Sequence, residues 1–217
     1  MFKLEQDIDL KCMKNLLINI AEEIMRQKDY LTTLDAACGD GDFGVGMYIG
    51  FKKAKESIEQ YKGNDVGILL EQVGNAIISS VGGASGPLFG TFFIEAGNVV
   101  KGKNKINLND IAAMFEAALQ RICQIGGAKP GDKTLVDSLE PAVKELQKAV
   151  KEGSTLMDAF ERAARAAKKG AEFTKDLVAK QGKARYLGQE TLGHQDPGAT
   201  AIYFIFNTIS VAYRLCF

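Results

Sequence analysis

Three aspartates lie within a stretch of thirteen residues, DAACGDGDFGVGM, at positions 35–47. Asp40 and Asp42 are two residues apart and Asp35 lies five residues before Asp40, so no regular helix would bring these pairs onto one face. The intervening glycines permit a tight reversal that turns the carboxylates toward one another. The stretch contains no basic residue. A hard divalent cation would remove the resulting repulsion.

The surrounding residues narrow the choice of cation. An EF-hand that began at Asp40 would need glycine and glutamate at positions where this chain has Val45 and Phe51. Magnesium binds few protein carboxylates and completes its octahedron with water and substrate phosphates, which matches a loop of three aspartates. A solvated acidic turn remains the alternative, because aspartate and glycine are common in turns.

A second glycine-rich stretch, SSVGGASGPLFGT at 79–91, follows one apolar helical run and precedes another. Its backbone amides, with Pro87 at an early helical position, are typical of a phosphate cradle or of simple helix packing. It is not a P-loop, since the chain contains no Gly-Lys-Ser or Gly-Lys-Thr.

Two further loops carry charged residues. In the loop at 126–142 a Pro-Gly turn precedes a helix start that we expect near Asp132 or Thr134. The loop at 182–200 holds the chain's one histidine, His194, with Lys183 and Arg185 as cations for a phosphate. A single histidine cannot build a histidine-rich metal site. It is either a phosphoryl acceptor or a turn residue bonded to backbone, and we favour the turn.

The elements that must position these loops are helical. Apolar residues recur at spacings of three and four, which predicts helices in the ranges 10–24, 65–81, 108–122, 134–150 and 155–177. Glycine-rich connections are expected at 39–50, 82–90, 126–131 and 188–198. The pattern predicts an all-α domain over 1–217, with about eight antiparallel up-and-down helices. Antiparallel neighbours would bring the four connections to one rim.

Composition excludes several functions. The 27 basic and 27 acidic residues leave no net charge, so nothing attracts nucleic acid or an anionic membrane. The acidic N-terminus is unlike a signal peptide. The apolar segment 198–217 is interrupted by polar residues, and we expect a buried helix there rather than a membrane span.

The four cysteines, without a C-x-x-C pair, predict neither a zinc site nor a disulfide framework. A reducing cytoplasm fits this usage best. Cys38 lies within the aspartate loop, where nearby carboxylates would raise the pKa of its thiol and make it less reactive.

Four motifs together resemble one family: DAACGDGDFG, GGASGPLFGT, KPGDKTLVDSLEPA and YLGQETLGHQDPGAT, in this order. The chain is similar, over essentially its whole length, to the nucleotide-binding L subunit of dihydroxyacetone kinase, the DhaL or DAK2-domain family. The resemblance implies a closed barrel of eight antiparallel helices with the nucleotide at one rim.

The resemblance also implies the site residues. Two Mg²⁺ ions that bridge the nucleotide phosphates would be held by Asp35, Asp40 and Asp42. The remaining positions implied to contact ADP or ATP are Phe43, Gly44, Val45, Gly46, Met47, Ala84, Ser85, Gly126, Leu135, Lys183, Asp196, Pro197 and Gly198.

The implied partners are a K subunit that holds dihydroxyacetone on a histidine and a phosphohistidine carrier, the M subunit, that rephosphorylates bound ADP. At 217 residues the chain is expected to need that K subunit as a separate protein. A homodimer stays open. The alternatives are an ATP-dependent kinase subunit for a related small ketose and a regulatory module without catalysis.

Four residues depart from the family pattern. Many members read G-D-G-D-H-G-T-N-M, whereas this chain has Phe43, Val45 and Gly46 in place of His, Thr and Asn. Side-chain donors are lost while the backbone amides remain, so we expect phosphate binding to survive. Lys183 stands where arginine is common and exchanges a bidentate fork for a point charge.

Overall fold

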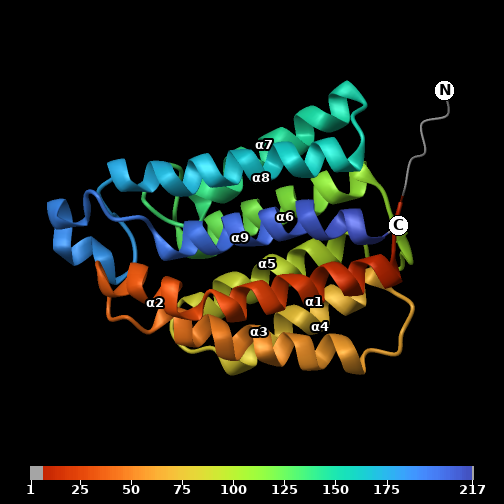
Figure 1. Ribbon diagram of the computed structural model, residues 1–217, viewed down its shortest axis with the longest axis horizontal. Helices are drawn as coiled ribbons and strands as arrows, with labels where there is room; N and C mark the ends of the chain where they lie inside the picture. Colours follow the sequence, from red (N-terminus) through yellow and green to blue (C-terminus); the bar gives the residue numbers. More distant parts are fainter. Residues whose placement is uncertain (1–6, 217) are drawn as a thin grey trace.

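The segments with apolar residues at helical spacing are helices in the computed structural model of this chain, which describes residues 7–216 (Figure 1). Its nine α-helices over that range are α1 (Leu10–Arg26), α2 (Lys28–Ala36), α3 (Phe43–Gln60), α4 (Val66–Ser80), α5 (Ser85–Val99), α6 (Leu108–Gly126), α7 (Val136–Glu152), α8 (Leu156–Phe173) and α9 (Pro197–Ala212). Short 3₁₀ helices are η1 (Thr174–Asp176), η2 (Lys183–Thr191) and η3 (Tyr213–Cys216). One antiparallel pair of two-residue strands, β1 (Ile8–Asp9) and β2 (Lys105–Ile106), joins the start of the described chain to the α5–α6 connection.

Eight of these helices form a closed ring of neighbours. Successive contacts run from α3 through α4, α5, α6, α7 and α8 to α9, and α1 packs against both α9 and α3 to close the ring. The helices alternate in direction, and α2 continues the course of α1 to cover one end of α3 and α9 (Figure 1). The prediction of an all-α barrel of about eight antiparallel helices is therefore confirmed.

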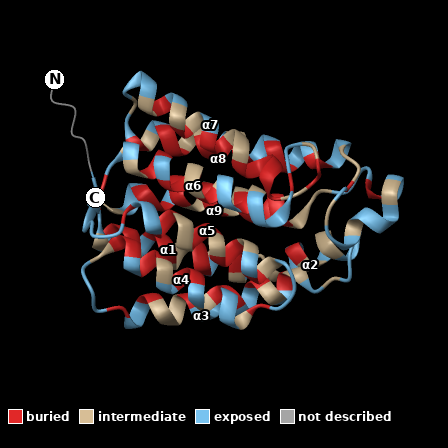
Figure 2. Cartoon of the chain, turned by 180° about the vertical axis from the view of Figure 1, so that it is seen from behind, coloured by how far each residue is buried: buried red, intermediate tan, exposed pale blue. Residues whose placement is uncertain are grey.

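Apolar side chains fill the space inside the ring, and Figure 2 shows the buried residues where the helices face one another. The bulkiest fully buried side chains are Phe51, Phe89, Phe92, Phe160 and Phe206. Exposed residues gather on the outer faces and on the connections (Figure 2).

Several glycines serve helix packing rather than turns. A Cβ added to Gly74 in α4 would lie 2.4 Å from the carbonyl oxygen of Gly90 in α5. A Cβ on Gly50 in α3 would lie 2.5 Å from Val81. The stretches 39–50 and 82–90, expected as connections, are therefore helical from Phe43 and Ser85 onward. The glycines in these stretches allow helix backbones to approach closely. Because glycine is also common in turns, composition alone could not distinguish a packed helix from a connection.

The last helical segment, Pro197–Cys216, is long and apolar enough by length and composition to cross a membrane, with a mean hydropathy of 1.2. The polar residues within this segment therefore do not exclude a membrane span by length and composition. Just over half of its apolar window, 56%, is buried inside the protein. This burial matches the core helix that the sequence predicted.

The cysteine prediction was wrong in one respect. Cys12 in the first turn of α1 and Cys216 in η3 form a disulfide, with Cα atoms 5.3 Å apart. The two residues are separated by 204 positions. Sequence spacing carried no sign of the bond, because it depends on ring closure between α1 and α9. Cys38 and Cys123 are free thiols.

Candidate functional site

A cavity of about 600 Å³ opens at the end of the barrel where α3, α5, α7 and α9 begin. All four glycine-rich regions contribute to its walls, so the predicted convergence on one rim is confirmed. Twelve of the predicted site residues line it: Asp35, Asp40, Asp42, Phe43, Ala84, Ser85, Gly126, Leu135, Lys183, Asp196, Pro197 and Gly198.

Four predicted residues in the first turns of α3 do not line this cavity. Gly44 packs against α2, where an added Cβ would lie 2.1 Å from the carbonyl oxygen of Lys28. Met47 is buried in the core, Val45 is 42% exposed, and a Cβ on Gly46 would face Val81. Any contact they make with a ligand at the cavity would come from the backbone at the start of α3.

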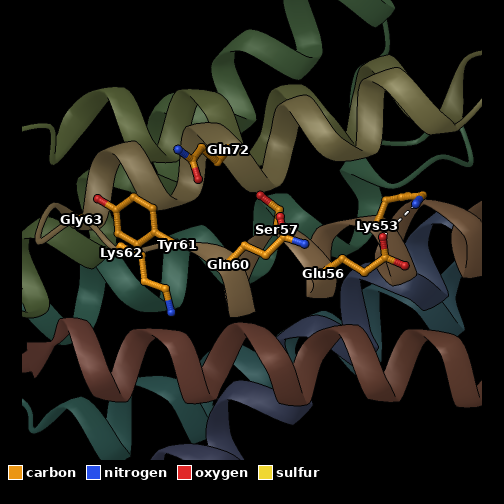
Figure 3. Close-up of a pocket in the computed structure, with 8 residues that line it drawn as sticks. All are labelled: Lys53, Glu56, Ser57, Gln60, Tyr61, Lys62, Gly63 and Gln72. Carbon is orange, nitrogen blue, oxygen red and sulfur yellow. Dashed lines mark hydrogen bonds and ion pairs between the residues drawn. The ribbon is translucent and has the colours of Figure 1, made fainter.

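A second hollow of about 490 Å³ lies on the outer side of α3 and α4 (Figure 3). Its side chains are those of an ordinary polar surface, such as Lys53, whose ammonium lies 2.8 Å from the Glu56 carboxylate. None of the residues predicted from the sequence lines it.

The three aspartates form one cluster. Carboxylate oxygens of Asp35, Asp40 and Asp42 lie within 4.8 Å of one another. The N–H of Phe43 donates to Asp35 Oδ2 at 3.0 Å, so the first residue of α3 fixes one carboxylate. Three convergent carboxylate oxygens beside an open cavity are a donor set that fits Mg²⁺.

The stretch 35–47 contains no basic residue, and the cation at the aspartate cluster comes instead from the loop at 182–200. The Lys183 ammonium donates to Asp40 Oδ2 and lies 3.7 Å from Asp42 Oδ2. This hydrogen bond lowers the pKa of Asp40, while Asp40 in turn raises the pKa of Lys183. Partial burial and the neighbouring Asp40 raise the pKa of Asp42. Lys183 therefore supplies the positive charge at the cluster in the protein itself.

Two helix starts at the cavity, those of α3 and α5, leave backbone amides without a capping side chain. Asp42 and Ala84 occupy the cap positions, and neither makes a side-chain cap hydrogen bond. At α7, by contrast, the N–H of Val136 donates to Thr134 Oγ1 at 3.2 Å. Between α4 and α5, a Cβ added to Gly82 or Gly83 would meet no atom within 4 Å, so this backbone is open to a ligand. Uncapped helix N-termini bind anions, and phosphate above all.

One wall of the cavity is apolar. It is lined by Leu88, Phe89, Ile122, Ile125 and Leu135. Such a surface suits the flat face of a nucleotide base. Ile122 and Ile125 were missed from the sequence, although their place in the last turn of α6 before Gly126 was an available signal.

The turn before α9 forms the adjoining wall. Asp196 caps α9, with Oδ2 accepting from the N–H of Ala199 at 2.7 Å. Removal from water raises the pKa of Asp196 to about 7, against the lowering effect of that amide and of the Lys133 ammonium. His194 is exposed and lies outside the cavity lining, and its backbone N–H donates to the Thr191 carbonyl at 3.4 Å. Its assignment as a turn residue and not a phosphoryl acceptor stays a prediction. Lys133, which lines the cavity, was missed.

A closed helical barrel with a carboxylate cluster and open helix starts around one cavity defines a domain of the kinase class, the transferases that move phosphoryl groups. Residues 37–211 match the DAK2 domain, and the chain therefore belongs to the DAK2 domain family.

The similar proteins are kinases or kinase subunits. The chain is 37% identical over 200 residues to the PEP-dependent dihydroxyacetone kinase, ADP-binding subunit DhaL, of Escherichia coli, covering 92% of this chain and 95% of that one. It is 34% identical to the L-erythrulose kinase of Pectobacterium atrosepticum, covering 89% of this chain and 33% of that protein.

The fold also matches a solved structure, that of the dihydroxyacetone kinase from C. freundii in complex with AMP-PNP and Mg²⁺. The TM-score is 0.73 at 25% identity, over 97% of this chain. The chain spans about one third, 36%, of that larger protein.

Proposed function

We propose that this chain is the Mg²⁺·ADP/ATP-binding subunit of a dihydroxyacetone-type kinase. The observation that carries the proposal is the convergence of Asp35, Asp40 and Asp42 with the uncapped starts of α3 and α5 at one cavity. The names of the E. coli subunit and of the C. freundii complex support the same ligands.

Each wall of the cavity has a proposed role. Asp35, Asp40 and Asp42 would hold two Mg²⁺ ions, which would supply positive charge to offset the negative charge of the nucleotide phosphates. The amides of Ala84 and Ser85 and those of Gly44 and Val45 at the start of α3 would hold the phosphate oxygens. The N–H of Phe43 donates to Asp35 and that of Gly46 to the Asp42 carbonyl, so Phe43, Gly46 and Met47 would shape this start and not serve as donors.

The base would lie on the apolar wall at Gly126 and Leu135, and the turn formed by Asp196, Pro197 and Gly198 would line the pocket beside Leu135. Lys183 contributes charge near the transferred phosphoryl group, where developing negative charge must be stabilised.

The reaction we propose is transfer of the γ-phosphoryl group of ATP to dihydroxyacetone held on a separate K subunit. A phosphohistidine carrier, the M subunit, would then restore ATP from the retained ADP. The chain's own residues orient the phosphates and exclude water, because phosphoryl transfer needs little covalent chemistry from the protein.

We place this reaction in the cytoplasm. Disulfides are rare in that reducing compartment, so Cys12 and Cys216 would be thiols there.

The replacement of the family histidine by Phe43 leaves the proposal intact. The Phe43 ring packs edge-on against Phe89, with centroids 6.0 Å apart, and its N–H keeps Asp35 in place. The backbone contribution of this position is therefore retained, while the side chain adds apolar surface to the cavity.

A second candidate function is an ATP-dependent kinase subunit for a related ketose. The 34% identity to an L-erythrulose kinase favours keeping this candidate. A regulatory module that binds nucleotide without catalysis is the third.

Native mass spectrometry of the gently purified protein, followed by chromatography of the released nucleotide, tests the proposal first. We expect bound ADP together with two magnesium ions. A protein that binds Mg²⁺·ATP weakly and exchangeably would favour the second candidate, and a protein that binds no nucleotide would refute the proposal. Turnover of dihydroxyacetone or erythrulose with a cognate K subunit then separates the two kinases from the regulatory module.

A further inference from the structure

Lys133 has a backbone conformation that side chains rarely adopt. Its φ is +60°, and it is the one non-glycine residue with a positive φ among residues 7–216. The left-handed conformation brings Cβ close to the following carbonyl and is unfavourable for any residue except glycine. A conformation of this kind persists where the surrounding structure requires it, and such sites cluster at functional positions.

The side chain of Lys133 is also unusual, since the residue is 4% exposed. Burial lowers the pKa of its ammonium, and nearby Asp196 counteracts this effect. A buried ammonium must be hydrogen-bonded to offset its loss of water. Lys133 Nζ donates to the carbonyl oxygen of Thr174 at 2.5 Å and to that of His194.

These two acceptors join three parts of the chain that are distant in sequence. Thr174 follows α8 and lies 41 residues from Lys133, and His194 lies 61 residues away in the turn before α9. Thr174 adds a second bond to the same turn, because its Oγ1 accepts from the N–H of Asp196 at 2.9 Å. The segment that leads into α9 is therefore fastened to the end of α8 on both sides of Gln195.

The fastened segment leads directly into the cavity wall. A Cβ added to Gly198 would lie 3.5 Å from Cβ of Leu135, so the start of α9 is in contact with the cap position of α7. Lys133 lies two residues before Leu135, and its ammonium holds the carbonyl of His194, four residues before Gly198. The two segments that meet at Leu135 and Gly198 are therefore also joined through the Lys133 ammonium.

We propose that Lys133 is a positioning residue of the nucleotide pocket, whose ammonium holds the 194–198 turn against α8 and α7 before the ligand arrives. This inference rests on the proposed function for the identity of the ligand. An apparent dissociation constant rises as the fraction of molecules with the binding-competent turn falls, so a preformed turn strengthens binding without a direct contact.

Three variants test the proposal. Lys133→Met keeps the length of the side chain and removes the ammonium. Lys133→Gly removes the ammonium and also relieves the left-handed backbone, so it remains informative if Lys133→Met fails to fold. Lys180→Met is the matched control, since Lys180 Nζ also donates to a backbone carbonyl, that of Gly131 at 3.0 Å, from a side chain that is 58% exposed.

Mg²⁺·ADP affinity by calorimetry, amide hydrogen exchange and urea unfolding are the readouts. If the competent turn falls to about one molecule in ten, both Lys133 variants should bind Mg²⁺·ADP about tenfold more weakly. The amides of Gly193 and Asp196 should exchange faster in both variants. Lys180→Met should bind as the wild type does. A merely structural role would lower the urea midpoint and leave the affinity of the folded protein unchanged.

Two results would overturn the role of Lys133. One is wild-type affinity in Lys133→Gly, and the other is unprotected exchange at the Asp196 amide of the ligand-free wild type. Failure of the wild type itself to bind Mg²⁺·ADP would instead refute the proposed function, and the exchange comparison would still show whether Lys133 orders the turn.

Discussion

The two ends of the barrel treat their helix starts differently. At the end away from the cavity, α1, α4, α6 and α8 begin with an extended residue whose side chain accepts a backbone N–H, and these caps are Asp9, Asp65, Asn107 and Thr155. At the cavity, α3 and α5 begin at residues with right-handed helical dihedrals and no side-chain cap. The other two starts at that end have side-chain acceptors, Thr134 at α7 and Asp196 at α9.

Capped helix starts contribute to the stability of the fold, whereas uncapped starts are available for binding. A capped start satisfies its own amides and stabilises the fold. An uncapped start leaves amides for an anion, at a cost in stability that a bound ligand would recover. The capped end also holds the β1–β2 pair and, in the oxidised protein, the disulfide, so the hydrogen-bonded and covalent reinforcement lies away from the cavity.

The largest expected effect tests the reinforced end. Reduction of the Cys12–Cys216 disulfide, or Cys12→Ser, should lower the free energy of unfolding by up to about 5 kcal/mol, because the bond closes a very long loop. Urea unfolding with and without reductant measures it, with Cys123→Ser as the control for loss of a thiol. Mg²⁺·ADP affinity should not change. An unaltered urea midpoint after reduction would show that this end does not depend on the bond.

The next effect belongs to the cavity. Loss of an outer-shell partner already weakens metal binding by about 10- to 100-fold, so Asp42→Asn should weaken Mg²⁺·ADP binding by more than about 100-fold, or about 3 kcal/mol. Helicity by circular dichroism should be retained. Asp29→Asn, at a fully solvated side chain in α2, is the matched control. Tight nucleotide binding by Asp42→Asn would remove the metal assignment.

A substitution at a capped helix start should have the opposite effect, lower stability with unchanged nucleotide binding. Thr155→Ala at the start of α8 should destabilise the protein by about 1 kcal/mol and leave nucleotide affinity intact. Ala84→Ser at the start of α5 should add no stability, because its backbone is helical where a capping residue is extended. Urea midpoints of both variants measure the difference. Equal responses at the two ends would contradict the comparison.

The smallest effect concerns the one capped helix at the cavity. The pKa of Asp196 is raised from 3.8 to about 7. Between these values the folded state binds more protons than the unfolded state, so this group's contribution to stability falls as pH rises from 4 to 7. Asp196→Asn keeps the cap without titrating. The variant should therefore gain stability relative to wild type between pH 4.5 and pH 8, as measured by urea unfolding. A constant difference across that range would mean that Asp196 titrates normally.

The features that were predicted from the sequence are those that depend on residues close together in the chain. The helix expected at 108–122 is α6 (Leu108–Gly126), and its start follows from the capping box of Asn107 and Asp110. The helix expected at 155–177 ends at Phe173, since residues 174–176 continue as the 3₁₀ helix η1. The aspartates converge as expected because glycines at 39 and 41 bend the loop between them.

Long-range contacts were beyond prediction. Lys183 reaches Asp40 across 143 residues, and no periodicity connects the two positions. Cys12 and Cys216 meet because the ring of helices closes, which is a property of the whole chain. Lys133 reads as an ordinary turn lysine in GDKT, and only the fold shows its ammonium inside the protein.

The disulfide has a topological consequence. Because it links Cys12 to Cys216, it closes the chain between these two residues into a covalent ring. A covalent ring of this kind can be given new termini at any connection that tolerates a break in the backbone. The connection between α3 and α4, at the capped end, is such a place, because residues 62–64 are exposed. A circular permutant reopened there would present new termini far from the cavity and leave all four of its glycine-rich walls continuous.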